Sequence, residues 1–335
     1  MQLTIDAAAT SIGVNYGTVA DNLPLPAAVA DFLIKSTTID RIKLYDTNPN
    51  ILKAFANTSI WVTVTVTNDY IPQLTDLSFA HQWLKSNILP HTPTTNIRYI
   101  LVGNEVVSTA DDRLISALVP AMRNLHRALV AAALDHRIKI STPHSLTILS
   151  TSDPPSAGRF TRRYEAALFG PLLGFLRATG SPFMVNPYPF FGLTSDTLNY
   201  ALFLPNPGVY DQNTGLVYTN MLDGQLDATY SAMKRVGFGD VDVVIAETGW
   251  PSAGDAGAQL GADGQKAATY NRNLIRHVNS GRGTPLMPNR RFETYIFALF
   301  NEDLKPGPSI ERNFGLFRPD LTAVYNVGVQ THTCV

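Results

Sequence analysis

Residues 241–250 read VDVVIAETGW, and this stretch joins the pattern of a buried strand to a carboxylate. Valine and isoleucine fill positions 243–245, a composition typical of strands covered on both faces, as in a parallel sheet. Glu247 ends the apolar run and is followed at once by Thr, Gly, Trp and Pro. Either the strand runs out into solvent there, or a functional carboxylate stands at its C-terminal end, and the other strands must decide.

Segments of the same kind recur along the chain and alternate with segments of helical periodicity. The expected strands are residues 11–17, 41–46, 61–67, 97–106, 138–145, 183–191, 241–250 and 292–303, and a helical pattern follows each of the first seven. Strands that alternate with helices predict a parallel sheet of βαβ units, and eight strands close a TIM barrel. We therefore expect an α/β fold, a (β/α)8 TIM barrel. A doubly wound open sheet is less favoured because no G-x-G-x-x-G follows the first strand.

The organisation of the chain favours one domain. It has 335 residues, of which 45% are hydrophobic, enough for a large core. No Pro/Ser-rich linker or internal repeat divides it. We expect a single domain over residues 1–335, with an N-terminal tail at 1–10 and a C-terminal tail at 328–335 that is compatible with truncation before an extension.

Charge and cysteine content argue against several classes of protein. The formal net charge is −1 without a Lys/Arg cluster, which argues against a nucleic-acid partner, and no run of 18 apolar residues forms a membrane segment. Cys334 has no second cysteine in this chain with which to form a disulfide. We expect the protein to be a monomer. The N-terminus lacks the pattern of a signal peptide, so the chain is either cytosolic or a mature form. The glycosylation sequon at Asn57 favours secretion only weakly.

Two carboxylates end expected strands, Glu105 in VGNEV and Glu247 in AETG. The fourth and seventh strands of a barrel face each other across its mouth, so both groups can approach one bound sugar. A retaining glycosidase needs such a pair, a general acid and a nucleophile about 5–5.5 Å apart. Asn104 is suited to bind the sugar 2-hydroxyl and Trp250 to stack on a sugar face. A lone strand-end glutamate is more often a surface ion-pair partner, but the pair makes that interpretation weak.

The chain resembles the plant β-1,3-glucanases of glycoside hydrolase family 17. The similarity lies in IGVNYGTVADNLP, KLYDTNPNILKAF, IRYILVGNEV, FMVNPYPFF, VVIAETGWPSAG and FALFNEDLKPGPSIERNFGLF. It implies a (β/α)8 barrel and retaining hydrolysis of internal β-1,3-glucosidic bonds, in callose or fungal wall glucan. By resemblance Glu247 is the nucleophile and Glu105 the acid/base, without cofactor or metal. It further implies β-1,3-glucan as the partner, an extracellular or cell-wall location, and a role such as plant defence.

Three charged residues near the last strand, Glu302, Lys305 and Glu311, match residues that the family places near the catalytic centre. A lysine among carboxylates keeps them ionised, so we expect Lys305 to pair with Glu247. A solvated charged loop is the alternative.

Aromatic residues at strand ends are candidates for binding sugar, because aromatic faces match the apolar faces of sugar rings. Tyr188 and Phe191, in NPYPFF, are expected to form a wall of the cleft, with a buried cluster as the alternative. Tyr45 is expected to donate a hydrogen bond to the nucleophile or to a sugar, although a core tyrosine fits equally well. Tyr16 and Asn15, at the end of the first strand, are further candidates for binding substrate.

Other chemistries find little support. The seven histidines lack H-x-x-x-H spacing, which argues against a catalytic metal, and no G-x-S-x-G motif indicates a serine hydrolase. His144 ends the fifth strand, where a structural histidine with satisfied hydrogen bonds is favoured over a cleft residue. The Gly-rich segment 254–264 is expected to be a mobile loop at the rim of the cleft.

Three alternatives to endo-hydrolysis remain open. A β-1,3-glucan transglycosylase would use the same covalent intermediate, and a β-1,3-1,4-glucanase would use the same scaffold. A non-catalytic β-glucan-binding wall protein is the third, although both carboxylates are intact.

Overall fold

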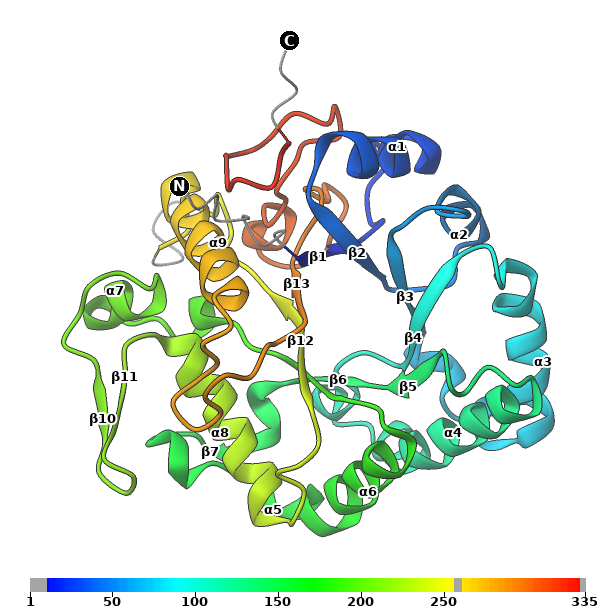
Figure 1. Cartoon of the computed structure of the whole chain (residues 1–335), viewed down its shortest axis with the longest axis horizontal. Coiled ribbons are helices and arrows are strands. Elements are labelled where there is room, and N and C mark those ends of the chain that lie inside the picture. Colours follow the sequence, from blue (N-terminus) through cyan, green and yellow to red (C-terminus); the bar gives the residue numbers. More distant parts are fainter. Residues whose placement is uncertain (1–10, 256–260, 332–335) are drawn as a thin grey trace, which may run out of the picture.

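The computed structural model describes residues 11–255 and 261–331, and its centre is a sheet of parallel strands (Figure 1). The order across this sheet is β5-β4-β3-β2-β1-β13-β12-β9-β6. The strands are β1 (Ile12–Tyr16), β2 (Ile39–Leu44), β3 (Trp61–Val66), β4 (Asn96–Val102), β5 (Lys139–Ser141), β6 (Pro143–Ser145), β9 (Phe183–Asn186), β12 (Val243–Thr248) and β13 (Thr294–Ile296).

The sheet closes through β5 and β6, which are two halves of one strand. Only Thr142 separates them, and it belongs to neither. Strand β5 pairs with β4, and β6 pairs with β9, both in parallel. The two ends of the sheet are therefore covalently continuous, and the eight expected strands form a TIM barrel.

Helices between the strands form an outer ring (Figure 1). They are α1 (Pro26–Ser36), α2 (Pro49–Ala54), α3 (Leu77–Asn87), α4 (Asp112–Ala131), α5 (Arg162–Tyr164), α6 (Gly170–Thr179), α7 (Leu198–Ala201), α8 (Met221–Arg235) and α9 (Gly264–Asn279). Their starts are encoded locally. The Asp111 carboxylate accepts the N–H groups of two residues in the first turn of α4, and Asp263 accepts one in the first turn of α9, each cap worth about 1 kcal/mol.

Several strands end earlier than the sequence predicts. Strand β4 stops at Val102 because Gly103 and Glu105 have left-handed backbones, with φ of 72° and 50°. The last strand, expected over 292–303, spans only Thr294–Ile296. Beyond it the backbone N–H of Ala298 donates to the carbonyl of Phe314 in the C-terminal loops, whereas those of Phe297 and Leu299 still donate to Thr248 and Asn15.

A register shift in β12 directs Glu247 toward the barrel mouth. Val244 and Ala246 belong to a cluster that includes residues of β4, β9 and β13, which marks the inner face of the barrel. Strict alternation after Ala246 would turn Glu247 outward. From Ile245 to Thr248, however, β12 advances three residues while β13 advances two. This bulge reverses the side of the sheet on which the Glu247 side chain lies.

Two short hairpins decorate the barrel, β7–β8 (Leu149–Thr151, Arg159–Phe160) and β10–β11 (Val209–Asp211, Leu216–Tyr218). In the part of the chain that the structure describes, no helix has the length and hydrophobicity to cross a bilayer. The tail at 1–10, the end of the 328–335 tail with Cys334, and the middle of the 254–264 loop lie outside the described residues.

Candidate active site

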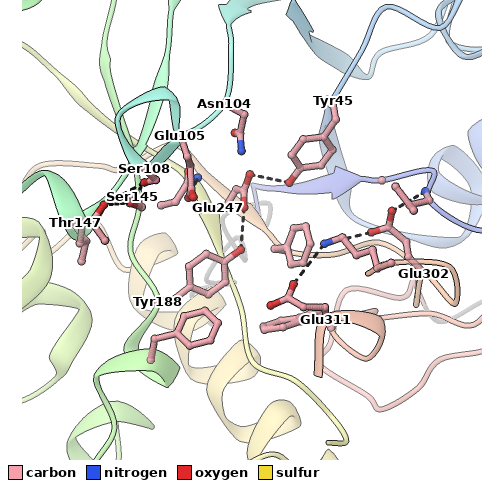
Figure 2. A pocket seen from close by; sticks show the side chains of 18 of the residues that line it. Tyr45, Asn104, Glu105, Ser108, Ser145, Thr147, Tyr188, Glu247, Glu302 and Glu311 are labelled. Carbon is pink, nitrogen blue, oxygen red and sulfur yellow. Dashed lines mark hydrogen bonds and ion pairs between the residues drawn. The ribbon is translucent and has the colours of Figure 1, made fainter. Parts of the chain in front are cut away.

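A cavity of about 900 Å³ lies at the C-terminal ends of the strands, and both strand-end glutamates line it (Figure 2). Nine of the twelve expected site residues contribute to its wall: Tyr45, Asn104, Glu105, Tyr188, Phe191, Glu247, Glu302, Lys305 and Glu311. The fourth and seventh strands of the barrel thus bring Glu105 and Glu247 to one cavity, as the spacing of the motifs predicts.

Three side-chain donors hold the Glu247 carboxylate. Lys43 Nζ and the Tyr45 hydroxyl each donate to its Oε1 at 2.7 Å, and the Tyr188 hydroxyl donates to Oε2 at 2.9 Å (Figure 2 shows both tyrosine bonds). Burial by itself raises the pKa of Glu247, but the Lys43 ammonium and the three hydrogen bonds outweigh it, so the pKa lies below its ordinary value. Glu247 is therefore an anion at neutral pH.

Glu105 has a contrasting environment. One side chain, Asn186, donates to its Oε1 at 2.7 Å. Burial raises the pKa of Glu105, the negative charge of Glu247 raises it further, and the Asn186 hydrogen bond offsets only part of this. Two carboxyl groups whose pKa values are displaced in opposite directions are suited to act as a proton donor and a nucleophile.

The cation that pairs with Glu247 is Lys43, and the expectation that Lys305 does so is wrong. Lys43 lies in β2 with a side chain that is 1% exposed, beneath the ring of Tyr45. Burial lowers the pKa of Lys43, and the facing Glu247 opposes that. Sequence reasoning missed this residue, although Lys43 stands two residues before Tyr45 and so shares its face of the strand.

Lys305 instead joins the two other expected carboxylates. Its Nζ lies 3.9 Å from Oε2 of Glu302 and 3.7 Å from Oε2 of Glu311, and 4.1 Å from the ring centre of Phe297. Glu302 also accepts the backbone N–H of Val19 at 2.9 Å. Burial raises the pKa of Glu302, and the Val19 and Lys305 contacts counteract it. This group forms a charged end of the cavity.

Aromatic rings build the wall beside Glu247. Tyr188 packs against Phe191, Phe297 and Phe314, with ring centres 5.5–6.4 Å apart. Phe191 is 59% exposed. The hydroxyl of Tyr188 bonds to Glu247, so this residue contributes both to the wall and to the carboxylate network.

Three expected site residues lie in the core rather than in the cavity wall. Trp250 is fully buried, its indole N–H donates to the carbonyl of Gly261 at 2.8 Å, and its rings pack on Phe190, so the stacking prediction is wrong. Asn15 is also fully buried and donates to the carbonyl of Ala246. Tyr16 is 2% exposed and packs its ring against a phenylalanine. Their positions near strand ends did not indicate that their side chains would be buried in the core.

Polar residues that the sequence did not single out also line the cavity. Asn186 holds Glu105, and the hydroxyls of Ser108, Ser145 and Thr147 bond to one another at 2.6–3.1 Å. In Figure 2 this hydroxyl cluster lies on the Glu105 side of Glu247, and Glu302 lies on the opposite side. Serine and threonine are too common after strands to be recognised from one sequence.

Asn104 and His144 contain polar atoms that the described residues leave without hydrogen-bond partners. Asn104 Oδ1 is buried in the cavity wall and is free to bind a ligand hydroxyl. His144 is fully buried beside Phe183 and Phe169, neither ring nitrogen has a partner, and burial lowers its pKa to about 3. The histidine is structural, but the expectation that its hydrogen bonds are satisfied is wrong.

Among the residues that the structure describes, no three metal-ligating side chains lie close enough together to hold a metal ion. The cavity can nevertheless transfer protons through Glu105 and attack an electrophilic carbon through Glu247. Its remaining wall offers hydroxyl, amide and aromatic surface, which is the chemistry that binds sugars.

Comparison with known proteins points the same way. The chain is 52% identical over 323 residues to a glucan endo-1,3-beta-glucosidase of Triticum aestivum, covering 95% of this chain and 70% of the relative. It is 50% identical over 323 residues to glucan endo-1,3-beta-glucosidase 7 of Arabidopsis thaliana, covering 95% of this chain and 64% of that relative.

A solved structure shows the same fold along nearly the whole chain. The beta-1,3-glucanase and allergen of Cryptomeria japonica pollen superposes with a TM-score of 0.90 at 44% identity, covering 96% of this chain and 99% of that one. Residues 12–329 match the family model described as glycosyl hydrolases family 17. The fold, the paired glutamates and these matches together show that the chain belongs to glycosyl hydrolase family 17.

Proposed function

We propose that this protein is a retaining endo-β-1,3-glucanase, which hydrolyses internal bonds of β-1,3-glucan through a covalent glycosyl-enzyme. The observation that carries the proposal is the pair of cavity carboxyls: three donors keep Glu247 ionised, whereas burial and the neighbouring Glu247 charge raise the pKa of Glu105. The family and the names of its relatives support the substrate class.

In the first step Glu247 attacks the anomeric carbon of the sugar bound over it. The bond from that carbon to the glycosidic oxygen breaks, and Glu105 gives its proton to the departing oxygen. The products are an ester between Glu247 and the sugar, and a free glucan end. Lys43, Tyr45 and Tyr188 keep the attacking carboxylate oriented and ionised until that bond forms.

In the second step Glu105, now a carboxylate, removes a proton from a water molecule. The water oxygen attacks the same carbon, the ester bond to Glu247 breaks, and the sugar leaves with its original configuration. Both carboxyl groups return to their starting protonation states. These steps use only the side chains of this chain, a water molecule and the glucan.

The cavity wall is suited to a polymer of glucose. The exposed ring of Phe191 and the ring of Tyr188 can cover apolar sugar faces, and the free Oδ1 of Asn104 can accept a hydrogen bond from the 2-hydroxyl. Callose or a fungal wall glucan has this chemistry. An endo mode of cleavage requires sugars on both sides of the cleaved bond, and the charged end and the hydroxyl cluster supply polar surface on both sides (Figure 2).

We infer that the protein works outside the cell, at the cell wall, where such polymers occur. Asn57 of the glycosylation sequon is exposed, and so is accessible to a sugar-transferring enzyme in the secretory pathway. Recovery of the natural protein without glycan on Asn57, from an intracellular fraction, would contradict this location.

Early product analysis of a linear β-1,3-glucan at high substrate concentration tests the function. Short oligomers of mixed length with β-configured new ends are expected. Products longer than the starting oligomers would indicate transglycosylation instead, and faster cleavage of mixed β-1,3-1,4-glucan would indicate a mixed-linkage enzyme. Binding without cleavage would overturn the proposal in favour of a glucan-binding protein.

A further inference from the structure

We infer that Asn68 is a positioning residue for the acid/base Glu105, which rests on the function proposed above. Asn68 begins the short helix η1 (Asn68–Tyr70), and only Thr67 separates it from the last residue of β3. Its Oδ1 accepts the backbone N–H of Asn104 at 2.8 Å, and its Nδ2 donates to the backbone carbonyl of Asn104 at 3.1 Å. One side chain thus satisfies both backbone polar groups of the residue before Glu105.

The Asn68 carboxamide continues the pairing of β3 with β4 beyond the ends of both strands. The last backbone bond between the two segments joins the Gly103 N–H to the carbonyl of Val66 at 2.9 Å. At the next residue, Asn104, the two bonds from the Asn68 side chain replace the bonds that a neighbouring strand would make. The side chain therefore has the role of one further peptide group in the sheet.

The backbone that Asn68 supports has an unfavourable conformation. Glu105 has φ 50° and ψ 40°, and a non-glycine residue in this left-handed region costs about 1–3 kcal/mol. Its N–H donates to the carbonyl of Pro143 at 3.0 Å, and its carbonyl accepts the N–H of Ser108 at 2.9 Å. Asn68 supplies the corresponding support on the preceding residue, so the turn is held from both sides.

Gly103 shows how closely this amide is fitted to the turn. A Cβ at Gly103 would lie 2.7 Å from Oδ1 of Asn68 and 2.6 Å from Cγ2 of Val106, both closer than real Cβ contacts. The missing side chain thereby leaves the space that the carboxamide occupies. Gly103 also has φ 72°, so the same residue permits both the turn and the contact.

Loss of the Asn68 carboxamide should let the turn relax and displace the Glu105 carboxyl from the glycosidic oxygen. A displacement of about 1 Å can cost roughly 10²-fold in rate. Glu247 is spared because it lies in β12 and is held by other donors. The defect should therefore be confined to proton transfer and should spare substrates whose leaving group needs little protonation.

The test compares Asn68→Ala with the unchanged enzyme on two substrates. We expect kcat/KM to fall about 10²-fold on linear β-1,3-glucan. On a 2,4-dinitrophenyl β-glycoside of laminaribiose we expect a fall in the rate of glycosyl-enzyme formation of less than about fivefold. An equal loss on both substrates would show that Asn68 acts on general stability, and no loss on glucan would also overturn the inference.

Two further variants make the result independent of folding. Asn68→Asp keeps an acceptor for the Asn104 N–H but loses the donor, so an intermediate loss with the same substrate dependence is expected even where Asn68→Ala fails to fold. Asn124→Ala is the matched control, because Asn124 also donates two bonds to backbone carbonyls after β3, those of Leu74 and Thr75, away from the cavity. Absence of glucan cleavage by the unchanged enzyme would reject the proposed function, whereas equal losses in an active enzyme would reject only the role of Asn68.

Discussion

The ends of β4 and β12 each present a glutamate to the same cavity but are built in opposite ways. Strand β12 continues past Glu247 to Thr248, and a buried ammonium and two phenolic hydroxyls hold the carboxylate. Strand β4 has already ended before Glu105, whose backbone is left-handed and whose carboxyl receives one amide hydrogen bond. One residue type thus obtains two proton affinities from its surroundings.

Burial alone does not decide the charge of a cavity glutamate. Burial raises the pKa of both residues, but only Glu247 has a cation against it. The anion at Glu247 then adds to the rise at Glu105, so ionisation of one carboxyl favours protonation of the other. Variants that remove one contribution at a time should reduce the contrast by different amounts.

The largest effect is expected from Glu247→Gln, which keeps the shape of the side chain and an oxygen for its donors but removes the nucleophile. Turnover should fall by roughly 10⁵-fold or more on every substrate, whatever its leaving group. Steady-state kinetics on glucan and on the dinitrophenyl glycoside measure this, with glucan binding as the check on folding. A variant that retained a tenth of the normal rate would exclude Glu247 as the nucleophile.

A smaller and more selective loss is expected from Glu105→Gln, which removes the transferable proton. We expect kcat/KM on glucan to fall by about 10²–10⁴-fold. On the dinitrophenyl glycoside, formation of the glycosyl-enzyme should remain fast and its hydrolysis should become slow, giving a burst of dinitrophenol in stopped-flow absorbance. Loss of the first step on both substrates would contradict the acid/base assignment.

Tyr45→Phe should reduce the difference between the pKa values of Glu247 and Glu105 without abolishing it. The rate requires Glu247 as an anion, so activity rises with pH through the lowered pKa of Glu247 and falls again through the raised pKa of Glu105. Removing the Tyr45 hydrogen bond from the anion raises the pKa of Glu247, so the acid limb should move to higher pH while kcat falls about tenfold. The pH dependence of kcat/KM measures this shift.

Tyr325→Phe is the matched control for the Tyr45 variant. Tyr325 accepts a hydrogen bond from Asn271 at 2.9 Å and does not line the cavity. Loss of this hydroxyl should therefore leave both limbs of the pH profile of kcat/KM unchanged. An unchanged acid limb in Tyr45→Phe, or an equal shift in Tyr325→Phe, would mean that the tyrosine bond does not set the charge of Glu247.

The fold was predictable because the pattern that encodes it is repeated. Runs such as 61–67 and 241–250 are rich in β-branched residues and separated by helical segments, so eight of them define a barrel even when single boundaries are wrong. The boundaries depended on tertiary contacts. After the last strand, the N–H groups of Phe297 and Leu299 still donate to neighbouring strands, but those of Ala298 and Asn301 donate to Phe314 and Phe317. No local sequence pattern indicates these last two partners.

The site was predictable only where chemistry and strand position coincided. Glu105 and Glu247 satisfy both conditions, whereas Lys43 is a buried lysine within β2 whose partner is 204 residues away in the sequence. Asn68 acts through the backbone of another segment, which a sequence does not reveal. Trp250 shows the opposite error, since its nearness to Glu247 in sequence suggested a sugar contact and the structure buries it.

The aromatic residues offer the smallest expected effect on catalysis and a direct test of that error. Phe191→Ala removes an exposed ring from the cavity wall, so KM for glucan should rise about fivefold, the equivalent of one stacking contact of about 1 kcal/mol, with the unfolding temperature unchanged. Trp250→Ala should instead lower the free energy of unfolding by about 3–5 kcal/mol, since it empties a fully buried site. Thermal unfolding and KM measured on both variants separate the two roles. If Trp250→Phe raised KM without loss of stability, the sugar-stacking role would return to Trp250; if Phe191→Ala lowered stability instead of affinity, Phe191 would be part of the packing that supports Tyr188.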